Sequence, residues 1–191
     1  MEHNNRVESG LIVEDTDENF HHWLAKAYLS PALRTQLSGA NVLIVPREGY
    51  ADLEMPVFPN GTEELLSFLK SQNERGISAD ICIEDKDYRE LTLHVDLIIL
   101  GAFVVTSILA PVVADLIGEY IKRRWPKKFE DSEIKFEITV VKEDGSAKKF
   151  LYEGPAKDIE AVVKPALKAF ADQAPRDHTR GSRQLPDSND E

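Results

Sequence analysis

The stretch from Leu97 to Ala114 dominates the hydrophobic pattern of the chain. Its sequence, LIILGAFVVTSILAPVVA, contains no charged side chain, although charged residues are frequent on both sides. A run of about 18 uncharged and mostly apolar residues reaches the usual length of a transmembrane helix. The pattern therefore predicts one long apolar helix over residues 97–124, which is either buried in the core or spans a membrane.

Polar residues recur at steps of three or four from the middle of this helix onward, which places them on one stripe. They are Ser107, Pro111, Asp115, Gly118 or Glu119, and Lys122. A buried helix of this kind can lie across a sheet with its stripe in water. As a membrane span it would carry Asp115 near one end. An ionisable residue at the bilayer centre raises the free energy of membrane insertion by about 3 kcal/mol.

The charges on either side of the stretch bear on the membrane alternative. Basic residues follow it and acidic residues precede it, so a span would keep its C-terminal side in the cytoplasm and send about 95 residues across the membrane. The first ten residues, MEHNNRVESG, contain no apolar region of a signal peptide. We expect a cytoplasmic protein. The alternative is an inner-membrane protein with its span over residues 97–121 and its C-terminal side in the cytoplasm.

The chain before this stretch shows shorter helical and extended patterns. Residues 17–39 read as a helical region that restarts or kinks at Pro31. NVLIV at 41–45 is typical of a buried strand, and a helix is expected to begin at Thr62 and end at Gly76. Two further strands are expected at 78–84 and 90–95, joined as a hairpin by the polar turn EDKDYR.

A second hairpin and a helix are predicted after the stretch. Apolar and polar residues alternate from Ile134 to Val140, and Asp144-Gly145 is a strong hairpin-turn signal. The returning strand carries Phe150 and Tyr152. A final helix follows Gly154-Pro155, and its apolar face comprises Ile159, Val162, Val163, Ala166, Leu167 and Phe170.

These elements predict an α+β fold, in which a largely antiparallel sheet packs against the long central apolar helix and a C-terminal helix. We expect a flexible N-terminal arm over residues 1–15 and a single domain over residues 16–170. Residues 171–191 contain almost no apolar side chain and are expected to form a disordered tail.

The composition narrows the classes of partner. Lys and Arg number 23 against 34 Asp and Glu, which gives a formal net charge of −11, and such an acidic balance argues against a nucleic-acid partner. The one cysteine, Cys82, excludes an intrachain disulfide and a cysteine-based zinc cluster. Because it lies between two isoleucines, we expect it to be a small core residue rather than a reactive thiol.

No pattern of catalytic or ligand-binding residues accompanies these elements. The sequence has no phosphate-binding glycine loop, nucleophile elbow or HExxH helix. His21 and His22 are adjacent, so on a helix they point about 100° apart and do not face one metal together. We therefore expect no catalytic, metal-binding or cofactor-binding residues and no enzymatic activity.

The most concentrated positive charge is the segment KRRWPKK. Its members are Lys122, Arg123, Arg124, Trp125, Lys127 and Lys128. As an interaction site, this basic cluster could contact a partner or phosphate groups such as those of lipid headgroups. Alternatively, the cations complement the dipole at the C-terminus of the helix, and Trp125 covers the edge of the core.

Residues 97 to 170 combine several of these features in a definite order. An apolar helix ends in a basic cluster, and an alternating strand, an Asp-Gly turn, a second strand and the segment YEGPAKDIEAVVKPAL follow. This arrangement resembles small α+β accessory modules of bacterial conflict and phage-defence loci, of the effector-associated constant component type. The resemblance implies an adaptor role without catalysis, which couples a sensor to an effector through protein contacts.

Two functions follow from the sequence. The first is an interaction or adaptor module that binds a partner protein or a second copy of itself. The second is a membrane-associated effector or anchor, in which residues 97–121 leave the core and the basic cluster contacts headgroups.

Overall fold

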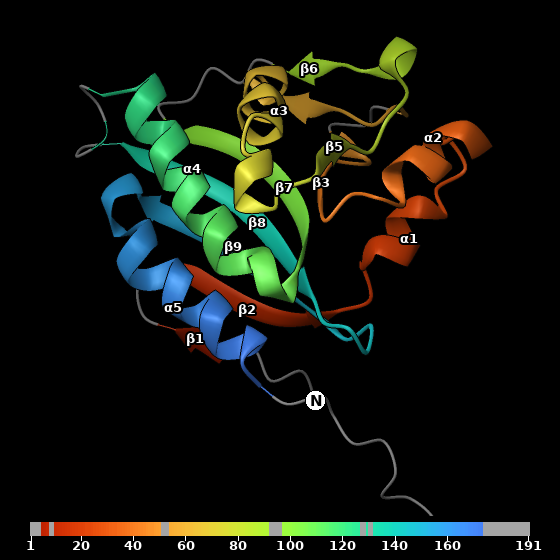
Figure 1. Ribbon diagram of the computed structural model, residues 1–191. Helices are drawn as coiled ribbons and strands as arrows, with labels where there is room; N and C mark the ends of the chain where they lie inside the picture. The colour runs from red at the N-terminus through yellow and green to blue at the C-terminus, as the bar shows by residue number, and fades with distance from the viewer. Residues whose placement is uncertain are drawn as a thin grey trace, which may run out of the picture.

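A mixed β-sheet with helices on both faces organises the part of the chain that the structure, a computed structural model, describes (Figure 1). The described residues are 5–7, 10–50, 54–91, 97–126, 129 and 132–173. In order across the sheet, the strands are β1 (Asn5–Val7), β2 (Leu11–Thr16), β9 (Ala147–Pro155), β8 (Glu133–Val141), β7 (Ile98–Thr106), β3 (Val42–Val45) and β5 (Ala79–Ile81). The pairs β7–β8 and β3–β5 are parallel and the other neighbours are antiparallel. The predicted α+β class with a largely antiparallel sheet is confirmed.

Helices cover the two faces of the sheet unequally. The helices are α1 (Phe20–Leu24), α2 (Pro31–Leu37), α3 (Thr62–Lys70), α4 (Ala110–Arg124) and α5 (Ile159–Ala171). Figure 1 shows α4 and α5 side by side across one face, with α3 next to them, while the short helices α1 and α2 pack on the opposite face. The remaining elements are the paired strands β4 (Phe58–Pro59) and β6 (Glu90–Leu91) and the 3₁₀ turns η2 (Asn73–Arg75), η3 (Asp85–Asp87), η4 (Ser107–Leu109) and η5 (Ala156–Asp158).

Each face of the sheet has its own hydrophobic core, because side chains alternate between the faces along every strand. Beneath α3, α4 and α5, β8 contributes its alternate residues Ile134, Phe136, Ile138 and Val140. Beneath α1 and α2, a smaller cluster includes Trp23, Leu43, Cys82 and Val104. Cys82 is fully buried there, as the sequence predicts.

The apolar stretch is not one helix. Its first part forms β7, η4 follows, and α4 begins only at Ala110, so the prediction of a helix over residues 97–124 is wrong before that residue. The physical reason is that β7 lies between β8 and β3 and contributes side chains to the cores on both faces of the sheet. A strand buried on both faces is a continuous apolar run, and that pattern alone does not distinguish it from a buried helix.

The predicted polar stripe is present on the helical part. Glu119 and Lys122 are exposed and Asp115 is half-buried, whereas the residues facing the sheet, such as Val113 and Ile117, are buried. The predicted span over residues 97–121 therefore begins as a strand inside the sheet. Among the described residues, no helix combines the length and the apolar character that crossing a membrane requires.

The hairpin predicted from strands at 78–84 and 90–95 does not form. β5 instead pairs in parallel with β3, and β6 pairs with β4. The reason is that α3 connects β3 to β5 as a crossover, which makes these strands parallel. Residues 92–96 of the predicted second strand lie outside the described residues.

The N-terminal region also differs from the prediction. Residues 11–16, expected to belong largely to a flexible arm, form β2, which pairs with β9 so that Leu11 lies opposite Tyr152 and is buried. The first helix begins after Asn19, whose side chain accepts a hydrogen bond from the His22 backbone, and not at residue 17, where the predicted helical region starts. Helix α2 restarts at Pro31, capped by Ser30.

The C-terminal hairpin and helix follow the sequence closely. The turn between β8 and β9 contains Gly145 in the left-handed region, with a φ of 81°. Helix α5 buries its predicted apolar face, including Ile159, Val163 and Leu167, and ends at Ala171. The predicted tail from residue 174 onward lies outside the described residues.

Candidate interaction surface

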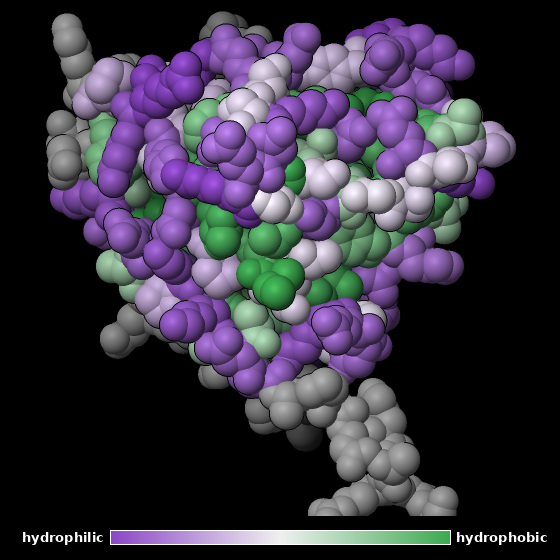
Figure 2. Space-filling view, viewed as in Figure 1, coloured by the Kyte–Doolittle hydropathy of each residue, from purple (hydrophilic) through white to green (hydrophobic). Residues whose placement is uncertain are grey.

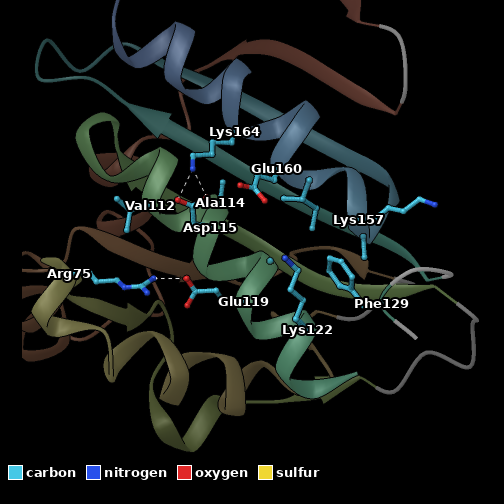
Figure 3. Close-up of a pocket in the computed structure, with 13 residues that line it drawn as sticks. Arg75, Val112, Ala114, Asp115, Glu119, Lys122, Phe129, Lys157, Glu160 and Lys164 are labelled. Atoms are coloured by element: carbon cyan, nitrogen blue, oxygen red, sulfur yellow. Dashed lines mark hydrogen bonds and ion pairs between the residues drawn. The ribbon is translucent and has the colours of Figure 1, made fainter. Parts of the chain in front are cut away.

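A groove of about 520 Å³ runs between α4 and the N-terminal part of α5 (Figure 3). We call it the α4–α5 groove. It exists because α4 presents the small residues Ala114 and Gly118 to it, and a side chain built on Gly118 would meet no atom within 4 Å. The charged residues along its walls are Arg75, Asp115, Glu119, Lys122, Lys157, Glu160 and Lys164.

Two ion pairs fix the walls of the groove, as the dashed lines in Figure 3 show. Lys164 of α5 reaches the Asp115 carboxylate of α4, with Nζ 2.8 and 2.9 Å from the two oxygens. The hydrogen bond to Asp115 raises the pKa of Lys164. Arg75 in η2 donates to Glu119 at 2.9 Å. Such exposed pairs contribute at most about 1 kcal/mol each, so they orient the side chains more than they stabilise the fold.

The other end of the groove is basic. The Lys122 ammonium lies 5.0 Å from the centre of the Phe129 ring, a cation–π contact. Lys157 is exposed and has no ion-pair partner among the described residues. Four cations and three carboxylates line the groove, in a chain with a net charge of −11. The groove is therefore mildly positive on an acidic protein.

An apolar patch lies where η4 leads into α4. Ile108 is 83% exposed, and Leu109, the next residue, and Val112, four residues further on, are half-buried. These three residues are called the Ile108 patch. Figure 2 shows hydrophobic residues gathered near the centre of this face, where Figure 1 draws the start of α4, with hydrophilic residues around them. In the described part of the chain, the other exposed large hydrophobic residue is Met55, at 44%.

The structure divides the predicted basic cluster between two hollows. Lys122 lines the α4–α5 groove, whereas Arg123 and Arg124 line a separate hollow between α3 and α4. Arg124 forms an ion pair with Glu64 and lies over the ring of Trp125, 5.2 Å from its centre. All three cations lie in the last turn of α4, where positive charge favours the helix dipole.

The remaining members of the cluster contribute less to a surface. Trp125 is half-buried and packs edge-on against the ring of Tyr120, at 6.1 Å between ring centres, so it covers the edge of the core. Lys127 and Lys128 lie outside the described residues. Of the four predicted residues that the structure describes, Lys122 is the one that lines the α4–α5 groove.

No family model matches this chain, and no curated protein or solved structure is significantly similar to it. Its function is therefore argued from its own surfaces.

The described residues offer few reactive groups. They contain no cluster of three His, Cys, Asp or Glu side chains arranged to hold a metal ion. Burial raises the pKa of the Cys82 thiol to about 12, and a thiol of that pKa forms almost no nucleophilic thiolate at neutral pH.

Sequence reasoning missed the residues that complete the groove. Lys157 and Lys164 belong to the last quarter of the chain, and only the packing of α5 against α4 brings them into one groove with Lys122. Ile108 carries a weak sequence signal, because it follows Ser107 in the polar stripe and precedes the first turn of α4.

Proposed function

We propose that this protein is a non-enzymatic interaction module, and that the α4–α5 groove together with the Ile108 patch is its contact surface for another protein. The main observation behind this proposal is that the Ile108 side chain is 83% exposed. Burying such a side chain gains about 1.5–3 kcal/mol, so a partner that covers it gains affinity that the isolated chain leaves unused.

The charges of the groove indicate the chemistry of the partner. Lys122 and Lys157 have no carboxylate paired with them among the described residues, and the groove has one more cation than anions. A complementary segment presents an apolar side chain to the Ile108 patch and carboxylates to the two lysines. The expected occupant is an acidic amphipathic segment of a partner protein.

The biological setting of the proposal comes from the resemblance to adaptor modules of bacterial conflict and phage-defence systems. The resemblance spans residues 97–170, in which residues 98–106 form a strand and a helix with a basic end, a hairpin and a final helix follow. In this proposal the protein is cytoplasmic and couples a sensor to an effector by binding, without catalysis of its own.

Site-specific photocrosslinking in the native host tests the proposal. A benzophenone amino acid replaces Ile108 in one variant and Met55, the other exposed apolar residue, in the control. We expect a discrete crosslinked partner from position 108 and none from position 55. We also expect Lys122→Glu to weaken the crosslink by reversing the charge that attracts an acidic segment.

The partner recovered in this way is then purified and its affinity for the wild-type chain and for Lys122→Glu is measured. A crosslink that is equal at both positions, or one that Lys122→Glu leaves unchanged, would contradict the proposed surface.

A further inference from the structure

Another hollow, of about 460 Å³, lies on the opposite face of the sheet. We call it the β3–β8 pocket. Its floor includes Ala102 of β7, which is paired with Val45 on one side and with Glu137 on the other. Because Ala102 has only a methyl group, it leaves a depression between larger neighbours. Trp23 of α1 forms one wall and the loop that follows β3 forms another.

Three neighbouring polar side chains in this pocket lack hydrogen bonds to the described residues. The closest approach of Arg47 to Glu137 is 3.7 Å, which is an ion pair but too long for a hydrogen bond, although the two side chains are only 31% and 24% exposed. Thr139 is 4% exposed, and no described residue hydrogen-bonds to its hydroxyl. The buried Nε1 atom of Trp23, which lines the same pocket, also has no hydrogen-bond partner among the described residues. Buried polar groups are normally bonded, so the pocket holds unused hydrogen-bonding capacity.

The three groups are held by well-defined backbone. Glu137 and Thr139 are two residues apart on β8, so they share one face of the sheet. The backbone of Arg47 exchanges two hydrogen bonds with Val57, at 2.8 and 3.0 Å, which fixes where its side chain begins. The guanidinium, carboxylate and hydroxyl therefore line one preformed pocket.

The two lysines nearest this pocket are already paired. Lys149 lies 2.7 Å from Glu18, and Lys26 lies 2.7 Å from Glu48. Trp23 is 6% exposed and contributes an apolar wall. The pocket thus offers one loosely paired cation and one loosely paired anion beside an apolar surface.

We infer that the β3–β8 pocket binds a zwitterionic small molecule of the α-amino-acid class. The Arg47 guanidinium binds its carboxylate, Glu137 and the Thr139 hydroxyl bind its ammonium group, and its side chain lies against Trp23 and Ala102. A simple anion would be repelled by Glu137 and a simple cation by Arg47, whereas a zwitterion satisfies both. This site is on the other face of the sheet from the α4–α5 groove and does not depend on the proposed function.

Tryptophan fluorescence of the full chain tests the inference. The sequence has two tryptophans, so the Trp125→Phe variant leaves Trp23 as the reporter. Each standard L-amino acid is titrated to about 10 mM, a range that detects even millimolar affinity. We expect saturable binding of one or a few amino acids. The matching amine without the carboxylate and the matching acid without the amine should each bind at least about tenfold more weakly.

Substitutions then locate the binding. Arg47→Gln should weaken it at least about tenfold, while Arg75→Gln, which removes the arginine of a comparable pair in the α4–α5 groove, should leave it unchanged. Ala102→Leu should abolish binding by filling the floor. Thr139→Val provides a second pocket variant of nearly equal size, and thermal unfolding checks that each variant folds.

Absence of saturable binding by every amino acid would overturn the inference. So would binding that survives Arg47→Gln, or equal binding of the single-charge analogues, which would indicate a site that recognises only an anion or a cation.

Discussion

At the scale of single residues, Cys82 shows how local sequence can predict an environment. It lies between two isoleucines, and in the structure it is fully buried, with its Sγ atom 3.8 Å from the Trp23 carbonyl oxygen. Burial raises the pKa of the thiol to about 12. Both observations agree with the core position predicted from sequence.

The Cys82 thiol should be unreactive in the native protein. The native protein is expected to react with Ellman's reagent only as fast as it opens, because the buried thiol is neither ionised nor accessible. In denaturant, one thiol should react at once. Rapid reaction of the native protein at neutral pH would contradict the burial of Cys82.

Gly10 shows what sequence patterns cannot reveal. Its φ is 71°, and a Cβ atom placed on it would lie 2.0 Å from the backbone oxygen of Glu153 in β9. Gly10 is therefore required for two reasons: its backbone is in the left-handed conformation, and it lies close to the backbone of β9. Neither is visible without the pairing of β2 with β9.

We expect Gly10→Ala to lower the free energy of unfolding by about 2–4 kcal/mol. The matched control is Gly49→Ala. Gly49 also has a positive φ, of 64°, but has open space around it, so this substitution should lower the free energy of unfolding by only about 1–2 kcal/mol. Urea denaturation of both variants measures the difference. Equal losses would mean that β9 does not approach Gly10 closely.

At the scale of elements, periodicity predicted some segments and failed at others for a definite reason. Within the helix predicted over residues 97–124, the part that carries most of the polar stripe is the one that forms α4, and the Asp-Gly turn predicted the β8–β9 hairpin. The residues of β7 carry no such stripe, because β7 lies between two strands and its two faces contribute to two cores. The parallel pairing of β5 with β3 depends on a crossover that no local pattern encodes.

The two sides of α4 should respond differently to substitution. Val113 is fully buried, so Val113→Asp places an unpaired charge in the core and should destabilise the protein by about 3–5 kcal/mol. Asp115→Leu removes only the partly exposed pair with Lys164 and should change stability by less than about 1 kcal/mol. Urea denaturation measures both. Tolerance of Val113→Asp would mean that this side of α4 does not face the sheet.

The N-terminus of α3 depends on a carboxylate from a distant strand. The Glu90 carboxylate of β6 accepts hydrogen bonds from the Tyr88 hydroxyl at 2.5 Å and from the backbone N–H groups of Gly61 and Glu63 at 3.0 and 3.2 Å. Partial burial alone would raise the pKa of Glu90, but these hydrogen bonds outweigh it and hold the pKa below its ordinary value. Glu90 thus supplies the cap that Gly61, without a side chain, does not.

This lowered pKa leads to a pH dependence of stability. Because the folded state favours the charged form, the stabilisation is complete above the unfolded pKa of about 4.3 and is lost as the pH falls through the lower folded pKa. The stability difference between wild type and Glu90→Gln should therefore be constant near neutral pH and shrink in acid. Urea denaturation across this pH range measures it, with the exposed Glu63→Gln as control. A difference that does not change with pH would contradict the capping role.

At the scale of the whole molecule, the sheet carries two kinds of surface. One face supports α4 and α5, with the Ile108 patch and the mildly positive α4–α5 groove, and the other holds the β3–β8 pocket. The sequence pointed to Lys122 through the basic cluster. It did not predict the groove, because Lys157 and Lys164 join Lys122 only through helix packing.

Cysteine accessibility in living cells tests the proposed contact surface most directly. Ile108→Cys and Met55→Cys each add one exposed thiol to a chain whose own cysteine is buried. Maleimide labelling of each variant is compared between the purified protein and host cells that produce it at its native level. We expect position 108 to label readily in the purified protein but to be protected in cells, while position 55 labels equally in both. Equal labelling of position 108 in cells and in purified protein would contradict the proposal that a partner covers this surface.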